Sequence, residues 1–169
     1  MIITITALKG GVGKTTTSIH LAAYLHENAP TLLIDADRNR SALVWSREDK
    51  LPFTVASQAG ATAIISKYTH IITDTQARPE QEELQDLVAS SDLLIIPTTA
   101  NHLDLDTTIK TTELLEKWGA KYKVLLTQVD YGEERIRTSV RCNPKTDFES
   151  ATINHSDTSP GISSQIIHH

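Results

Sequence analysis

Short apolar runs alternate with amphipathic stretches over the first 130 residues of the chain. The runs are rich in β-branched residues and predict buried strands at residues 2–7, 31–34, 53–56, 71–72, 93–96 and 124–126. Between them, apolar positions recur at helical spacing in residues 18–28, 41–49, 59–67, 80–91 and 104–118. Strands that alternate with helices predict an α/β fold, with a mainly parallel sheet flanked by helices.

Prolines and a glycine mark expected boundaries within this pattern. Pro79 is predicted to lie in the first turn of the helix that follows it, and Pro97 is predicted to stop the strand at residues 93–96. Gly119 is expected to cap the end of the helix at residues 104–118. The run Val124 to Leu126 is predicted to be the last buried strand.

The pattern stops after Asp130. The final 39 residues contain ten Ser or Thr, and apolar residues are scattered singly at Ile136, Val140, Phe148 and Ile153. Such a composition buries too little apolar surface to offset the entropy of ordering the chain, so we expect an irregular tail over residues 131–169, with at most a short helix at residues 133–141. Residues 1–130 are predicted to form the folded domain.

A glycine-rich loop follows the first predicted strand and precedes the first helix. Its glycines allow consecutive backbone N–H groups to converge on phosphate oxygens, and the N-terminus of the helix adds positive potential. Lys14 is expected to bind the β- and γ-phosphates, and the Thr15 hydroxyl to bind Mg²⁺. The predicted phosphate-binding residues are Lys9, Gly10, Gly11, Val12, Gly13, Lys14, Thr15 and Thr16.

Carboxylates end two of the apolar runs. Asp35 and Asp37 follow residues 31–34, and Asp74 follows residues 71–72. Ligands of an open parallel sheet bind beyond the carboxyl ends of its strands, so we expect these aspartates to face the phosphate loop. There they could hold Mg²⁺ and its waters and orient an attacking water, which is the chemistry that phosphoryl transfer needs.

The segment KGGVGKTT is similar to the deviant Walker A motif of the ParA/MinD family of ATPases, which carries an additional lysine before the glycines. The resemblance is strongest to small ParA-type partition proteins and implies a P-loop NTPase-like fold that binds ATP or ADP with Mg²⁺. It implies that Lys9 reaches the phosphates of a partner subunit across a nucleotide-sandwich homodimer. It also implies roles for the acidic residues: Asp35 supports Mg²⁺, Asp37 positions the hydrolytic water and Asp74 is the Walker B aspartate.

The same resemblance implies further residues and partners. Residues 75–79 match the family's nucleotide-sensing segment, in which Arg78 is either a switch residue or an ordinary exposed arginine. The implied function is an ATPase that dimerises on ATP and positions DNA or another cargo, with Lys9, Lys14 and Asp37 as the catalytic residues. A ParB-like adaptor protein and non-specific DNA are the implied partners.

Two departures from the family pattern keep alternatives open. Arg38-Asn39 replaces the Pro-Gln that many ParA proteins have after the second aspartate, and no pattern after Asp130 matches the family's C-terminal helices. A frameshift or early stop in the gene is one hypothesis for that loss. A nucleotide-binding remnant with an impaired ATPase cycle is therefore the alternative to a working ATPase, and metabolic ligases that share the P-loop are a minor one.

Charge and cysteine content exclude several other classes. The net charge of −5 argues against a domain that is basic overall, although a local basic patch could still meet DNA. Cys142 is the single cysteine, so neither a disulfide framework nor a cysteine-ligated iron–sulfur cluster is expected from one chain. We expect a cytoplasmic protein, with nucleoid association as an option, and no membrane partner, because neither a spanning run nor a basic amphipathic C-terminal helix is present.

Overall fold

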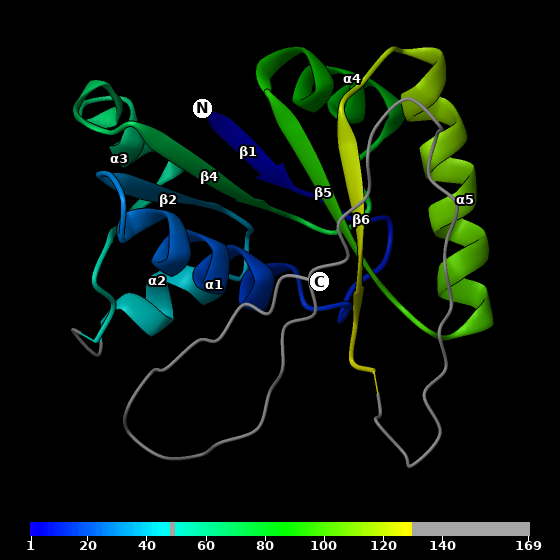
Figure 1. The fold of residues 1–169 in the computed structure, drawn as a ribbon, viewed down its shortest axis with the longest axis horizontal. Coiled ribbons are helices and arrows are strands. Elements are labelled where there is room, and N and C mark those ends of the chain that lie inside the picture. The colour runs from blue at the N-terminus through cyan, green and yellow to red at the C-terminus, as the bar shows by residue number, and fades with distance from the viewer. Residues whose placement is uncertain (48–49, 130–169) are drawn as a thin grey trace. The chain divides into compact units, whose positions relative to one another are not determined.

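Six parallel strands form the centre of the computed structural model, which describes residues 1–47 and 50–129 (Figure 1). Their order across the sheet is β3-β2-β4-β1-β5-β6. Met1–Val129 cluster into one compact unit. The strands are β1 (Ile2–Ile5), β2 (Thr31–Ala36), β3 (Thr54–Ser57), β4 (His70–Thr75), β5 (Leu93–Thr99) and β6 (Tyr122–Thr127). The predicted parallel α/β fold is confirmed. The predictions for residues 48–49 and 131–169 lie outside the described residues.

Helices connect the strands and lie on both faces of the sheet (Figure 1). They are α1 (Lys14–His26), α2 (Ser41–Ser46), α3 (Gln58–Ala61), α4 (Gln81–Ser90) and α5 (His102–Lys117), with a short 3₁₀ helix, η1, at Ile65–Lys67. The helix predicted at residues 59–67 is thus divided into α3 and η1. Gly119 follows α5 in the left-handed conformation (φ 67°), as its predicted capping role requires. None of the helices within the described residues is long and apolar enough to cross a membrane.

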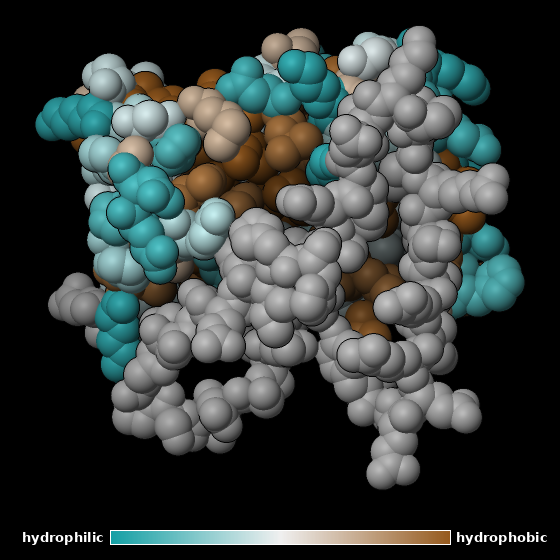
Figure 2. Space-filling model, viewed as in Figure 1, coloured by the Kyte–Doolittle hydropathy of each residue, from teal (hydrophilic) through white to brown (hydrophobic). Residues whose placement is uncertain are grey.

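Alternating side chains of the strands build a core on each face. On one face Ile3, Leu33 and Ile72 pack with Ile19 of α1 and Ala42 of α2. The opposite face holds two further clusters, one under α3 and η1 and one under α4 and α5. Among the side chains coloured in Figure 2, the apolar ones gather toward the middle of the visible face and the hydrophilic ones toward its margins. Helices therefore pack against both faces of the sheet, as is usual for a parallel sheet.

Pro97 does not stop its strand, contrary to the prediction, because β5 continues to Thr99. The backbone carbonyl of Ile95 accepts a hydrogen bond from Thr6, so Ile95 faces β1, and Pro97 two residues later faces the same side. The last register pair between the two strands is Ile5 with Ile95. Pro97 therefore lacks an N–H at a place where β1 no longer offers a ladder partner, and the strand tolerates it.

Two smaller predictions are also wrong. Pro79 lies before α4 rather than in its first turn, because Glu80 is the N-cap residue and forms a capping box with Glu83. The strand containing Val124 to Leu126 is half-buried at every position rather than buried. Among the described residues β6 pairs only with β5, so it forms one edge of the sheet.

Candidate nucleotide-binding site

The glycine-rich loop joins the end of β1 to the start of α1. Gly11 (φ 79°) and Gly13 (φ 85°) have left-handed backbones, which a residue with a side chain adopts only with strain. Gly13 is the N-cap residue of α1, and no side chain caps the helix there. The first N–H groups of α1 are therefore left for an anion, and the loop has the form that a phosphate-binding site needs.

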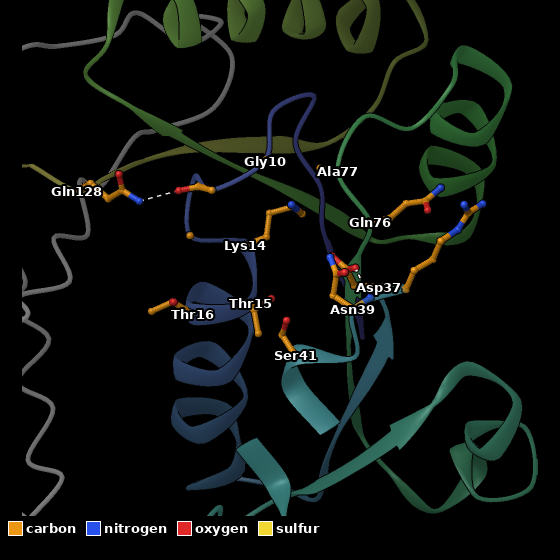
Figure 3. Close-up of a pocket in the computed structure, with 13 residues that line it drawn as sticks. Gly10, Lys14, Thr15, Thr16, Asp37, Asn39, Ser41, Gln76, Ala77 and Gln128 are labelled. Atoms are coloured by element: carbon orange, nitrogen blue, oxygen red, sulfur yellow. Dashed lines mark hydrogen bonds between the residues drawn. The ribbon is translucent and has the colours of Figure 1, made fainter. Parts of the chain in front are cut away.

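A pocket of about 610 Å³ opens beside this loop (Figure 3). Lys14, the first residue of α1, lines it and is only 7% exposed, so its ammonium is presented to the pocket with little surrounding water. The lining residues come from the loop and the first turn of α1, the segment from β2 into α2, and the residues that follow β4 and β6. The lining residues are Gly10, Gly11, Gly13, Lys14, Thr15, Thr16, Asp37, Arg38, Asn39, Ser41, Gln76, Ala77 and Gln128.

Asp74 is fully buried at the end of β4, next to Asp35 in the register of β2 and β4. Ser18 Oγ lies 3.2 Å from Asp74 Oδ1, whereas Asp74 Oδ2 has no hydrogen-bond partner. Burial raises the pKa of Asp74 to about 6; the Thr15 and Ser18 hydroxyls and the Lys14 charge oppose this rise, and the Asp35 charge adds to it. A buried carboxylate oxygen is thus available beside the Thr15 hydroxyl.

Asp35 and Asp37 differ in what their carboxylates already bind. Asp35 is 4% exposed and accepts hydrogen bonds from the backbone N–H groups of Asp37 (3.1 Å) and Leu43 (2.9 Å), one on each oxygen. Asp35 therefore holds the loop between β2 and α2 in place. Asp37 lines the pocket, and its Oδ1 accepts a hydrogen bond from the Asn39 N–H at 2.9 Å. The structure brings these two aspartates and Asp74 to the same edge of the sheet.

The donor set fits a magnesium ion held mainly by a nucleotide and water. No group of three or more His, Cys, Asp or Glu side chains that could hold a metal occurs in the described part of the chain. Mg²⁺ usually keeps several waters and is bound by one or two carboxylates together with substrate phosphates. The unpartnered oxygen of Asp74 belongs to a carboxylate of that kind, and the neighbouring Thr15 hydroxyl offers a further oxygen ligand.

Lys9 is placed differently from the other lysine of the loop. It is not among the described residues that line the pocket. Its ammonium instead forms an ion pair with Oδ1 of Asp104, in the first turn of α5. Asp104 was not among the site residues predicted from the sequence.

Two further contacts of the loop escaped the sequence analysis. The Thr127 hydroxyl, at the end of β6, donates to the carbonyl oxygen of Val12 (2.8 Å) or of Thr98 (3.1 Å). The next residue, Gln128, donates from Nε2 to the carbonyl oxygen of Gly11 at 2.7 Å (Figure 3). The available signal for these two contacts was that Thr127 and Gln128 lie at the carboxyl end of an apolar strand, as Asp74 does. The two side chains fix the loop's carbonyls and so help to aim its N–H groups into the pocket.

The nucleotide-sensing segment predicted at residues 75–79 lies partly in the pocket. Gln76 and Ala77 line it, whereas Arg78 is exposed and is not among the lining residues that the structure describes. Arg78 has a left-handed backbone (φ 60°), and its N–H donates to the Ala7 carbonyl at 3.0 Å. That hydrogen bond ties the segment to the end of β1.

Fold and site together define a P-loop nucleotide-binding domain: a parallel sheet, a glycine loop with a buried lysine at a helix N-terminus, and carboxylates at the ends of the adjacent strands. The chain matches the CobQ/CobB/MinD/ParA nucleotide binding domain family over residues 3–143, and it belongs to that family.

Individual relatives agree with this assignment. The chain is 35% identical over 130 residues to Maintenance of carboxysome distribution protein A of Gloeobacter kilaueensis, an alignment covering 72% of this chain and 60% of that protein. It spans 50% to 60% of the length of the first three curated relatives it matches.

Solved structures share the fold. A plasmid partition protein from Borrelia burgdorferi B31 bound to AMPPNP superposes with a TM-score of 0.63 at 21% identity, covering 78% of this chain and 77% of that one. The MinD cell division protein of Aquifex aeolicus gives a TM-score of 0.61 at 23% identity, covering 77% and 70%.

Proposed function

We propose that this protein is a ParA-type ATPase that binds Mg²⁺ and ATP, dimerises on ATP and uses hydrolysis to end the dimeric state. The observation that carries the proposal is the pocket in which the loop glycines, the buried Lys14 and Asp37 meet. A relative named for carboxysome distribution and a structural neighbour described as a plasmid partition protein support a role in positioning a cargo.

Each site residue has a distinct task in this proposal. Residues 10–16 hold the phosphates through backbone N–H groups, and Lys14 neutralises their charge. Thr15 and Asp74 hold Mg²⁺, which supplies charge stabilisation to the phosphates when bound, and Asp35 supports that site through the loop it anchors. Asp37 positions the water that attacks the terminal phosphate. Lys9 binds the phosphates of the nucleotide held by a second copy of the chain.

The two lysines of the loop provide the test. Lys14→Ala should abolish ADP and ATP binding, because it removes the buried ammonium of the pocket. Lys9→Ala should keep ADP binding and lose ATP-dependent dimerisation, because Lys9 lies outside its own pocket. Lys110→Ala, an exposed lysine on α5, is the control and should behave as wild type. Isothermal titration calorimetry measures binding, and analytical ultracentrifugation measures dimerisation.

The outcomes separate this proposal from a non-catalytic nucleotide-binding protein. ATP turnover that depends on Asp37 supports the ATPase, whereas ATP binding without turnover supports the alternative. Normal dimerisation of Lys9→Ala would remove Lys9 from its proposed role.

The partners are proposed at the level of chemistry. We propose a ParB-like adaptor that stimulates hydrolysis, non-specific DNA bound by the ATP dimer, and a cytoplasmic location with nucleoid association. ATP turnover measured with and without duplex DNA, together with DNA retention measured with and without ATP, tests the proposed DNA binding. DNA retention that does not depend on ATP would contradict it.

A further inference from the structure

Lys9 is anchored within its own subunit by a buried carboxylate. Its Nζ pairs with Asp104 Oδ1, while the second oxygen of that carboxylate accepts a hydrogen bond from the Thr99 hydroxyl at 2.5 Å. The Lys9 side chain is 42% exposed, but that of Asp104 is only 6% exposed. The Lys9–Asp104–Thr99 cluster therefore consists of a half-exposed cation on a buried, fully engaged anion.

The surrounding backbone fixes the carboxylate. Thr99 is the last residue of β5, and its hydroxyl also accepts a hydrogen bond from the N–H of Asn101 at 3.3 Å. Asn101 is the N-cap residue of α5 and accepts from the N–H of Leu103 at 3.0 Å. Lys9 and Thr99 both keep the pKa of Asp104 below its usual value, so the carboxylate is ionised at neutral pH. The anion cannot follow Lys9 if the lysine moves.

Position makes this contact relevant to the proposed reaction. Lys9 directly precedes the glycine loop, yet its ammonium is bound to α5 rather than to a group that lines the pocket. One ammonium cannot fully engage both Asp104 and the phosphates of a nucleotide in another subunit. Departure of Lys9 would also leave Asp104 buried without its charge partner, which is unfavourable.

We propose that Asp104 is a positioning residue that holds Lys9 within the single subunit, so that dimerisation on ATP requires exchange of this carboxylate for the phosphates bound by the partner. This inference rests on the proposed function. The Lys9–Asp104 ion pair therefore opposes dimerisation until the phosphates of ATP compete with Asp104 for the Lys9 ammonium. Thr99 orients the carboxylate for Lys9.

The first test examines the single subunit without nucleotide. Amine labelling followed by mass spectrometry measures how fast Lys9 reacts. The reagent should reach Lys9 several-fold faster in Asp104→Asn, because the neutral amide holds the ammonium much more weakly than the carboxylate does. Thr99→Val, which keeps the charge and loosens the carboxylate, should give a smaller increase. Asp106→Asn, an exposed position of the same helix, is the matched control and should label as wild type. Unchanged Lys9 labelling in Asp104→Asn would overturn the inference.

The second test examines dimerisation with AMPPNP by analytical ultracentrifugation. Asp104→Asn should dimerise at about tenfold lower protein concentration, the size of one charge-assisted hydrogen bond. The double variant Lys9→Ala/Asp104→Asn should behave as Lys9→Ala, because the effect of Asp104 passes through Lys9. Unchanged ADP affinity in Asp104→Asn shows that the fold is retained.

The outcomes distinguish this inference from the proposed function. Dimerisation of Asp104→Asn equal to or weaker than wild type overturns the inference. Failure of the wild-type protein to dimerise with AMPPNP instead refutes the proposed function, and the labelling experiment still decides whether Asp104 holds Lys9.

Discussion

Asp74 is expected to destabilise the nucleotide-free protein at neutral pH. Its carboxylate is fully buried, one of its oxygens has no partner, and burial raises its pKa from the ordinary 3.8 to about 6. At about 1.4 kcal/mol for each pKa unit, this difference corresponds to about 3 kcal/mol. Because the folded pKa lies above the unfolded one, the folded state gains stability from the bound proton. That gain is complete below about pH 4 and is lost as the pH rises through about 6.

Replacing Asp74 with Asn removes the charge and keeps the shape. In the absence of nucleotide and Mg²⁺, Asp74→Asn should raise the free energy of unfolding by up to about 3 kcal/mol at neutral pH and leave it nearly unchanged below about pH 4. The same substitution should weaken Mg²⁺-dependent nucleotide binding. The protein would thus lose binding where it gains stability, which is common for buried charges at functional sites.

Urea unfolding followed by circular dichroism, from about pH 4 to about pH 8, measures this effect. Asp86→Asn, at an exposed position on α4, is the control and should change stability little at any pH. A stability difference for Asp74→Asn that does not vary with pH, or a variant less stable than wild type at neutral pH, would refute the argument from burial.

Two further substitutions test other parts of the site. Thr127→Val removes the hydroxyl that bonds the Val12 and Thr98 carbonyls, so ADP affinity should fall about tenfold in calorimetric titration. Thr112→Val, on α5, is the control. Unchanged ADP affinity in Thr127→Val would show that the loop keeps its form without this contact from β6. Asp37→Ala should bind AMPPNP normally but release phosphate at least about a hundredfold more slowly, and wild-type turnover would exclude Asp37 as the residue that positions water.

The sequence was sufficient for the order of the strands and helices, and the residues that it singled out include the loop glycines, Lys14 and Asp37, which line the pocket. Strands and helices followed from local periodicity, because apolar side chains must meet the core on every second residue of a strand or once per helical turn. The meeting of Asp35 with Asp74 was predictable for a related reason: both end parallel strands, and the carboxyl ends of parallel strands share one edge of the sheet.

Local pattern was insufficient where a residue's role depends on its neighbours in the sheet. Proline usually ends a strand. Pro97 is tolerated inside β5 only because β1 has already ended on the side that Pro97 faces. The half-burial of β6 likewise depends on its place at one edge of the sheet that the described residues form, which an apolar run of residues cannot reveal.

The glycine loop shows most clearly which features the sequence determined and which the tertiary structure determined. Its order of glycines, lysine and threonine predicted a phosphate site from the sequence alone, because that chemistry depends on backbone conformations coded within a few residues. Only the tertiary structure showed that Asp104 binds Lys9 from 95 residues away and that Thr127 reaches Val12 from 115 residues away. Those contacts exist because β5 lies beside β1 and β6 beside β5, and strand order arises from packing the whole chain rather than from any local pattern.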